Sequence, residues 1–173
     1  MLSALYFFSA DTQNTKKEIR PLKGTAPYEV EKRPLPAGVN LNELLPKQVG
    51  HYTLTLLEES ENRGVTASSI RVDGPSVYAT YKYGSKEVFV ELAISSTAES
   101  AQEILVTAAG DTSGGKFPTD PRFGALGTEP SYLRVNSKAL GSFYAWTRSN
   151  YYFSASAKGG VEDLDEFMRS FPY

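Results

Sequence analysis

The feature that most constrains the fold is a regular alternation of apolar and polar residues over 77–83 that resumes over 88–92. Side chains of a β-strand point alternately to the two faces of a sheet, so this alternation predicts two strands. Gly84 and Ser85 stand between the two segments and predict a tight turn. The chain therefore contains an antiparallel hairpin, and the rest of the fold has to supply neighbours for it.

Further strands are predicted in four segments, residues 52–56, 132–135, 140–147 and 151–157, and residues 67–72 are a weaker candidate for a strand. In the first of them, Tyr52, Leu54 and Leu56 alternate with threonines and should share one face. The acidic residues that follow, Glu58, Glu59 and Glu61, predict a charged turn after this strand.

Two segments have apolar residues at helical spacing. The first covers residues 98–108, with Ser96 or Thr97 as its N-terminal cap and Gly110 as its end. The second covers residues 161–171 and carries acidic residues in its first turn, where they suit the positive end of the helix dipole. Both helices should present one apolar face to the sheet.

The predicted order is hairpins, helix, three strands, helix. It indicates an α+β fold in which two main helices pack on an antiparallel sheet of five to six strands. We expect residues 41–173 to form this single domain, because hydrophobic residues make up 40% and charged residues 22% of the chain, as in globular proteins. Residues 1–40 contain four prolines among mixed charges and predict an extended N-terminal arm with a short apolar stub.

Over residues 44–173 this order resembles that of small PsbP-like domains. The resemblance is carried by Leu44-Leu45-Pro46 and Val49-Gly50 before the first strand, the hairpin from Tyr81 to Val90, and Ala145-Trp146 before the last strand. It implies an antiparallel sheet flanked by helices in a protein that attaches to a larger assembly, often on the outer side of a membrane. It implies no functional residues, because no ligand motif of this chain matches one of the family.

Composition excludes several classes of chemistry. The chain has no cysteine, which excludes thiolate nucleophiles, thiolate-held metals and disulfides. Its one histidine, His51, cannot build a histidine-rich metal site. The formal net charge of −2 disfavours nucleic acid as a partner, since such binders present a basic surface. We therefore expect no cofactor, no metal and no nucleic acid.

The segment from Gly110 to Lys116 has the spacing of a phosphate-binding loop up to its lysine. Such a loop also needs a Ser or Thr after the lysine and a helix that begins there. This chain has Phe117 at the first position, and Pro118 prevents an ordinary helix. We interpret the segment as a flexible glycine-rich loop within the aperiodic residues 111–130.

No nucleophile and base can be paired from the sequence. His51 follows Gly50 at a strand start, where a turn or edge role is commoner than catalysis, and no Gly-x-Ser-x-Gly elbow is present. The carboxylates of residues 58–61 have no partner at glycosidase separation. An unrecognised hydrolase therefore stays a third hypothesis, and it requires His51 or the 111–130 segment to meet a nucleophile in space.

Aromatic residues are numerous, with 11 tyrosines, 9 phenylalanines and one tryptophan. Tyr78, Tyr144, Trp146 and Tyr152 lie on strand faces opposite rows of aliphatic or small residues. Either the helices cover these rings as core, which is usual for α+β sheets, or the rings form a docking surface. Under the second alternative, Tyr144 and Trp146 contact a partner.

The N-terminal stub is the other candidate contact. Its apolar residues are Leu2, Leu5, Tyr6, Phe7 and Phe8. It is shorter than the roughly 20 apolar residues that span a bilayer, so it is either a docking segment or the remnant of an anchor. Lysines and arginines between residues 16 and 23 favour a cytoplasmic flank, whereas the family resemblance favours the extracytoplasmic side of a membrane.

The leading functional hypothesis is a non-catalytic binding or accessory domain that attaches to a membrane or to a larger protein complex. The expected partner is a protein complex or membrane protein, with peripheral membrane contact as a further mode of attachment. The alternative is a carrier of a small ligand or lipid in a cavity between the sheet and the helices. A partner retained under mild detergent would favour the first hypothesis, and a bound apolar molecule the second.

The glycine-rich loop generates a testable prediction. Because Phe117 and Pro118 replace the magnesium-binding hydroxyl and the helix, millimolar Mg-ATP or Mg-GTP should leave the melting temperature of the protein unchanged. A saturable increase that disappears in Lys116→Ala would contradict this interpretation.

Overall fold

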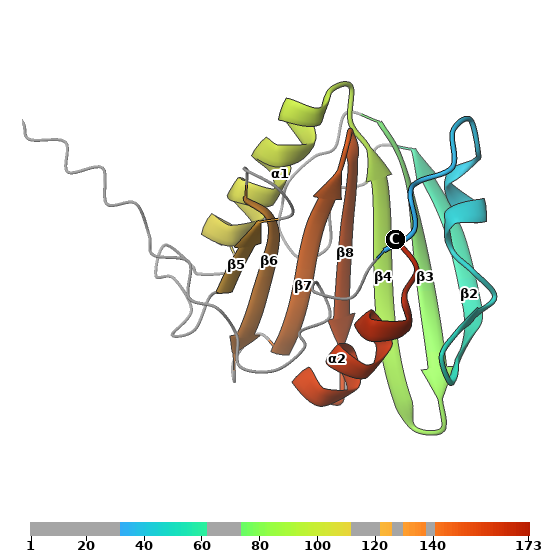
Figure 1. Cartoon of the computed structure of the whole chain (residues 1–173). Coiled ribbons are helices and arrows are strands. Elements are labelled where there is room, and N and C mark those ends of the chain that lie inside the picture. The colour runs from blue at the N-terminus through green and yellow to red at the C-terminus, as the bar shows by residue number, and fades with distance from the viewer. Residues whose placement is uncertain (1–31, 62–73, 112–121, 126–129, 138–140) are drawn as a thin grey trace, which may run out of the picture.

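The structure is a computed structural model and describes residues 32–61, 74–111, 122–125, 130–137 and 141–173. The elements are η1 (Leu41–Leu44), β1 (Gln48–Val49), β2 (Tyr52–Glu61), β3 (Pro75–Tyr83), β4 (Lys86–Ile94), α1 (Ala98–Asp111), β5 (Arg122–Ala125), β6 (Pro130–Ser137), β7 (Gly141–Arg148), β8 (Tyr151–Ala157) and α2 (Val161–Ser170). Figure 1 shows a curled sheet with α2 and the C-terminal segment lying across one face.

All neighbouring strands are antiparallel, in the order β1-β2-β3-β4-β8-β7-β6-β5. The first four strands follow one another along the chain, and so do the last four in reverse. The two halves meet where β4 pairs with β8, from Val88↔Ala157 to Ile94↔Tyr151. The α+β class and the antiparallel sheet are thus confirmed.

The predicted count of five to six strands was too low. The sheet has eight strands, of which β1 contains only two residues, so seven are longer. The additional strands are β1 and β5, and neither is long enough to show the alternation of a strand in the sequence. β5 also lies inside the Gly- and Pro-rich residues 111–130, where we expected no regular structure. The predicted strand over 67–72 lies outside the described residues.

β2 is longer than predicted and contains an irregularity. It continues to Glu61, so Glu58, Glu59 and Glu61 belong to a strand and not to a charged turn. The register shifts between Leu54, which pairs with Tyr81, and Leu56, which pairs with Thr80. A β-bulge of this kind adds one residue and moves all later side chains to the other face. Leu56 therefore does not share a face with Tyr52 and Leu54, as the alternation had predicted.

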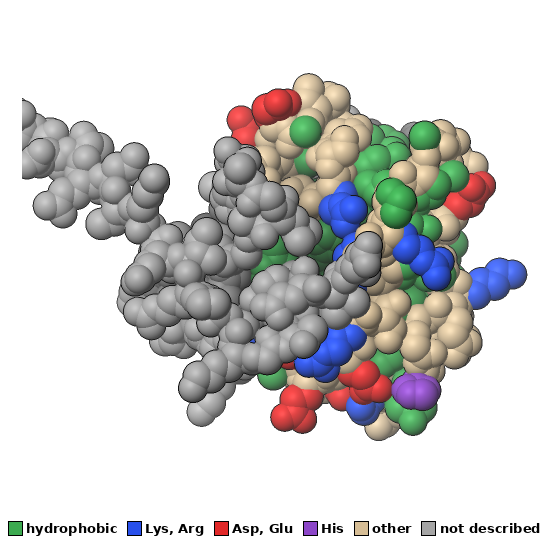
Figure 2. All heavy atoms as spheres, viewed as in Figure 1, with side chains coloured by type: hydrophobic (Ala, Val, Ile, Leu, Met, Phe, Trp, Pro, Cys, Tyr) green, Lys and Arg blue, Asp and Glu red, His purple; other side chains and the backbone are tan. Residues whose placement is uncertain are grey.

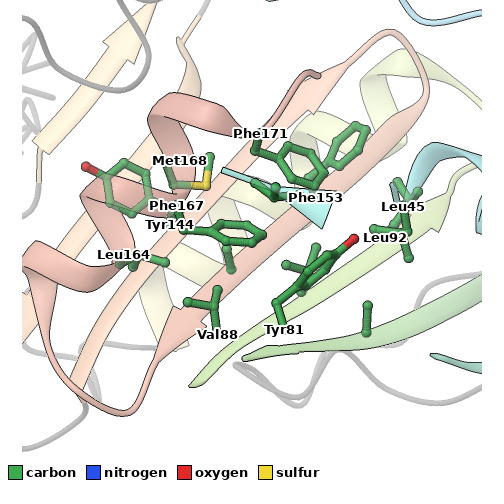
Figure 3. Close-up of a cluster of buried hydrophobic side chains, with 14 of the residues drawn as sticks. Leu45, Tyr81, Val88, Leu92, Tyr144, Phe153, Leu164, Phe167, Met168 and Phe171 are labelled. Atoms are coloured by element: carbon green, nitrogen blue, oxygen red, sulfur yellow. The ribbon is translucent and has the colours of Figure 1, made fainter. Parts of the chain in front are cut away.

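α2 packs on one face of the sheet, and an aromatic core lies between the helix and the strands (Figure 3). Trp146 and Phe153 stack with ring centroids 5.0 Å apart, and Phe171 meets Trp146 edge-on at 5.7 Å. Phe167 of α2 lies 5.0 Å from the ring of Tyr81. The predicted amphipathic helix is confirmed, and its apolar face holds β3, β7 and β8 together.

α1 packs against the opposite face, on β6, β7 and β8. Its N-terminus is capped as predicted, because Thr97 Oγ1 accepts a hydrogen bond from the amide of Ser100 at 3.1 Å. Its buried side chains include Ala101, Ile104, Leu105 and Ala108. Leu133, Phe143, Ala145 and Tyr152 form a second apolar cluster with Ile104 and Leu105. Ala93 of β4 also belongs to this cluster, whereas the remaining side chains of β4 and those of β2 and β3 lie outside it.

The last residues of the predicted arm contact the domain. Lys32 Nζ donates hydrogen bonds to the carbonyl oxygens of Met168 and Phe171, at 2.5 and 2.7 Å, at the C-terminal end of α2. The amide of Arg33 donates to the carbonyl of Pro172, and Leu35 and Val39 pack against the aromatic core. The last carbonyl groups of a helix have no donor within the helix, so donors at this end are stabilising. Residues 32–40 therefore belong energetically with the domain, although they precede the boundary predicted at residue 40.

Two truncations should separate the described part of the arm from the rest. Deleting residues 1–40 removes the Lys32 hydrogen bonds and the packing of Leu35 and Val39, whereas deleting residues 1–31 keeps them. We expect the longer deletion to unfold with a free energy lower by about 2 kcal/mol than the shorter one, measured by denaturant titration. Equal stability of the two truncated proteins would contradict this assignment.

Lys32 also generates a pH prediction. Burial, with the Arg148 guanidinium adding to it, lowers the pKa of Lys32 from its usual 10.5 to about 8. Between these values the unfolded chain binds more protons than the folded protein, so stability should rise with pH. The neutral amine keeps two N–H donors for the two carbonyls.

We therefore expect the difference in free energy of unfolding between the wild type and Lys32→Met to grow from about pH 7 to about pH 9.5. Lys47→Met, which changes an exposed lysine, is the control and should follow the wild type. A difference that does not change with pH would show that Lys32 keeps its ordinary pKa.

Candidate binding surface

The most unusual surface feature is a group of exposed apolar side chains on one half of the sheet. Among the residues whose side chains are described, the exposed large apolar ones are Leu56 (48%), Leu57 (37%), Tyr83 (45%) and Phe89 (43%). All four belong to β2, β3 or β4. Grouped apolar exposure is a more informative signal than a single exposed leucine.

Leu56 and Phe89 lie on the same face, in one row across three strands. Leu56 of β2 pairs with Thr80 of β3, and Thr80 pairs with Phe89 of β4. Directly paired residues of antiparallel strands project to the same face, about 5 Å apart. The row continues through Ser156 to Phe143, which lies in the cluster that α1 packs on. We call Leu56, Thr80 and Phe89 the sheet patch, because this is the part of the face beyond α1.

The outer edge of β2 adjoins the sheet patch. β1 pairs with β2 only at Tyr52 and Thr53, and beyond them the described part of the chain places no strand along this edge. Leu57 is paired with Ala79, so it lies on the opposite face from Leu56. The Leu54 amide still donates to the carbonyl of Lys47 at 3.0 Å. The β2 edge, residues 55–61, therefore exposes an apolar side chain on each face, beside backbone groups that have no strand neighbour among the described residues.

The β2 edge is also acidic. Glu58 and Glu59 are both exposed, and they project to opposite faces through their pairing with Tyr78 and Val77. The Glu59 carboxylate accepts a hydrogen bond from the side-chain amide of Asn42, beside η1. Carboxylates on an edge strand discourage pairing with another acidic or neutral strand. The edge thus combines apolar contact area with negative charge.

A buried carboxylate lies two residues beyond Phe89 on the same face. Glu91 is 3% exposed, and Ser154 Oγ donates to its Oε2 at 3.4 Å. Burial, with the charge of Glu91 adding to it, raises the pKa of the neighbouring Tyr152 hydroxyl. Tyr152 therefore stays protonated at neutral pH. These groups lie inside the protein and form no part of the exposed sheet patch.

A second polar cluster ties the β3–β4 hairpin to α2. Lys86 Nζ lies 2.8 Å from Asp163 Oδ1 and 3.1 Å from Glu166 Oε2. Hydrogen bonds to these carboxylates raise the pKa of Lys86 above its usual value. The Tyr52 hydroxyl donates to the backbone carbonyl of Asp163 at 3.3 Å. These contacts fasten the start of α2 to the end of the sheet and are structural in kind.

His51 lies at the surface beside this cluster (Figure 2, purple). Its ring stacks on Tyr83 with centroids 5.3 Å apart. This position at the turn before β2 agrees with the turn role that the sequence favoured. The stacking gives the imidazole an aromatic neighbour, whereas a general base of a catalytic triad is oriented by a carboxylate.

A third polar cluster lies between α2 and β6–β7. Arg134 Nη2 is 2.7 Å from Asp165 Oδ2, and the Tyr144 hydroxyl donates to Asp165 Oδ1. Arg134 also lies over the Tyr144 ring, 5.6 Å from its centroid. Burial, followed by the hydrogen bond to Asp165, raises the pKa of Tyr144. The cluster binds the helix to the sheet through groups that are mostly withdrawn from solvent.

The predicted contact role of Tyr144 and Trp146 is corrected by this arrangement. Tyr144 is 0% and Trp146 is 3% exposed, and both belong to the aromatic core beneath α2. The alternative, that the helices cover these rings, is the one that the structure follows. The apolar stub, with Leu2, Leu5, Tyr6, Phe7 and Phe8, lies outside the described residues, as does most of the glycine-rich loop.

The sequence held a signal for the surface residues that were missed. Phe89 stands between Glu87 and Glu91 on the polar side of an alternating strand. This position indicates a large aromatic side chain at the surface. Leu56 and Leu57 are consecutive, so in a strand they project to opposite faces and place an apolar side chain on each of them. The acidic residues after Leu57 suggested a turn, so the second half of β2 was not predicted.

Two kinds of site are missing from the described residues. In the part of the chain that the structure describes, no group of three or more His, Asp or Glu side chains could hold a metal ion. None of the described helices is long and apolar enough to cross a membrane.

Comparison of the chain with protein-family models, with curated proteins and with solved structures found no match. The resemblance to PsbP-like domains therefore stays a prediction that rests on the order of strands and helices.

Proposed function

We propose that the chain is a non-catalytic binding or accessory domain that attaches to a larger protein complex through β2, β3 and β4. The observation that carries this proposal is the exposure of Leu56 and Phe89 in one row beyond the cover of α1. Burying a large apolar side chain stabilises an association by roughly 1.5–3 kcal/mol. A partner that covers the sheet patch would complete the layer that α1 begins.

The polar groups near the sheet patch also support binding over catalysis. Glu91, two residues beyond Phe89 on the same face, is buried and hydrogen-bonded to Ser154. Glu87, two residues before Phe89, lies 2.7 Å from the Lys82 amine in an ion pair. His51 belongs to the turn before β2 and stacks on Tyr83. A hydrolase needs a base and a nucleophile within hydrogen-bond reach of a common position. The groups described here are used to hold elements together.

The alternative of a carrier draws no support from the layer beneath α2. Trp146, Phe153 and Phe171 fill that layer with rings whose centroids lie 5.0 to 6.3 Å apart. Packed aromatic rings at these distances make favourable contacts with each other. A ligand placed there would have to displace them.

Attachment to a membrane is the second part of the proposal and concerns another segment. The stub from Leu2 to Phe8 would insert at the membrane or dock on a membrane protein, while the sheet patch binds the complex. Two weak contacts joined by a linker bind more tightly than either alone. In this arrangement the domain would lie on a membrane surface, and the resemblance to PsbP-like domains supports the extracytoplasmic side.

The test compares partner recovery by the full-length wild type and by the double variant Leu56→Ser/Phe89→Ser, purified from native cells in mild detergent. We expect the double variant to recover at least about tenfold less of a discrete partner than the wild type, because two apolar contacts are removed. Its melting temperature should stay close to that of the wild type, since substitutions at exposed positions usually change stability by less than about 0.5 kcal/mol.

Tyr83→Ser is the matched control. It removes an aromatic side chain of similar exposure (45%) at the hairpin end, outside the sheet patch. This variant should recover the partner as well as the wild type does. Equal recovery by the double variant would place attachment elsewhere, and a bound apolar molecule in the purified wild type would favour the carrier.

A further inference from the structure

We infer that the partner binds as an extended, basic segment that pairs with the β2 edge and lays its side chains against Leu56 and Leu57. This inference rests on the proposed function and specifies how the partner is recognised. It differs from docking of a globular surface on the sheet patch, because backbone hydrogen bonds to β2 would supply much of the affinity.

Most of the outer edge of β2 lacks a neighbouring strand among the described residues. β1 pairs with β2 at Tyr52 and Thr53 only, and the Leu54 amide donates to the carbonyl of Lys47. From residue 55 to residue 61, the described residues place no strand along the outer edge of β2. Edge strands are usually protected because they template the addition of another strand. Here the two consecutive leucines increase the apolar area available to an added strand instead of reducing it.

Leu56 and Leu57 lie on opposite faces of β2. Leu56 projects to the face of Phe89, and Leu57 projects to the face of α2. Alternate side chains of an added strand would also project to these two faces. Successive apolar side chains of the partner could therefore contact Leu56 on one face and Leu57 on the other. A helix or a globular surface would reach only one of them.

Charge decides which segments are accepted. Glu58 and Glu59 are exposed, one on each face, and both follow the leucines along the same edge. An added strand with lysine or arginine on both faces would pair with them, whereas acidic side chains directly opposite would be repelled. The same carboxylates disfavour a second copy of this chain, because antiparallel pairing of two β2 edges brings acidic segments together.

The test uses the full chain and peptides of defined sequence. The probe is a peptide of about twelve residues with a repeating Lys-Lys-Val-Val sequence, which puts lysine and valine on both faces of an added strand. The comparison peptide has glutamate in place of lysine. We expect the basic peptide to bind about fivefold more tightly, since two exposed ion pairs are gained. Binding should slow hydrogen exchange of the backbone amides of residues 55–61. Methylation of alternate peptide nitrogens should abolish binding.

Charge reversal provides a second measurement. Glu58→Lys/Glu59→Lys should reverse the preference, so that the acidic peptide becomes the tighter ligand by a similar factor. Glu99→Lys/Glu103→Lys changes the net charge equally on the exposed side of α1 and should leave the preference unchanged. If the double substitution at β2 does not fold, Glu58→Lys alone should remove the preference.

The outcomes separate this inference from the proposed function. Slowed exchange at Phe89 but not along β2, or binding that survives methylation of the peptide, would overturn strand pairing while leaving the sheet patch as the binding surface. A dimer of the full chain that is lost in Leu57→Asp would show that a second copy takes the edge and would also overturn the inference. Failure of the proposed function is detected independently, by undiminished partner recovery in Leu56→Ser/Phe89→Ser.

Discussion

The structure depends on the contact between the apolar face of α2 and the centre of the sheet. Phe167 packs against Tyr81 of β3, and Phe171 packs against Trp146 of β7 and Phe153 of β8. One half of the sheet comes before α1 in the chain and the other half after it, and α2 contacts both halves. Lys32 then hydrogen-bonds to the carbonyls at the end of α2. The N-terminal segment, the two half-sheets and the C-terminal helix therefore share one core.

Local patterns predicted most of this arrangement. The hairpin around Gly84, the cap at Thr97 and the amphipathic α2 follow from alternation, capping chemistry and helical spacing, and each was found where the sequence placed it. The bulge at Thr55 could not be predicted, because it arises from pairing with β3 and not from the residues of β2 themselves. β1 is too short to have a period. These two features determine the binding edge, which is why the candidate site was less predictable than the fold.

The two helices cover unequal parts of the sheet. α2 lies over the junction of the two halves, whereas α1 lies over β6, β7 and β8 on the opposite face. The sheet patch results from this inequality, since one helix of this length cannot cover eight strands. The exposed apolar residues are therefore a consequence of the architecture as well as of the individual side chains. A partner bound on β2–β4 would cover the part of this face that α1 leaves exposed.

The pairing of β4 with β8 has a consequence for how the chain is made. Glu91 contacts Ser154 across 63 positions of sequence, so the central ladder joins segments that leave the ribosome far apart in time. The β2–β3–β4 meander can form as soon as it is synthesised, but β4 remains a second open edge until residues 151–157 emerge. During that interval Val88, Val90 and Leu92 are without their final neighbours, and the nascent chain is exposed to misassociation. Synthesis of the last quarter of the chain is thus the step that protects the first half.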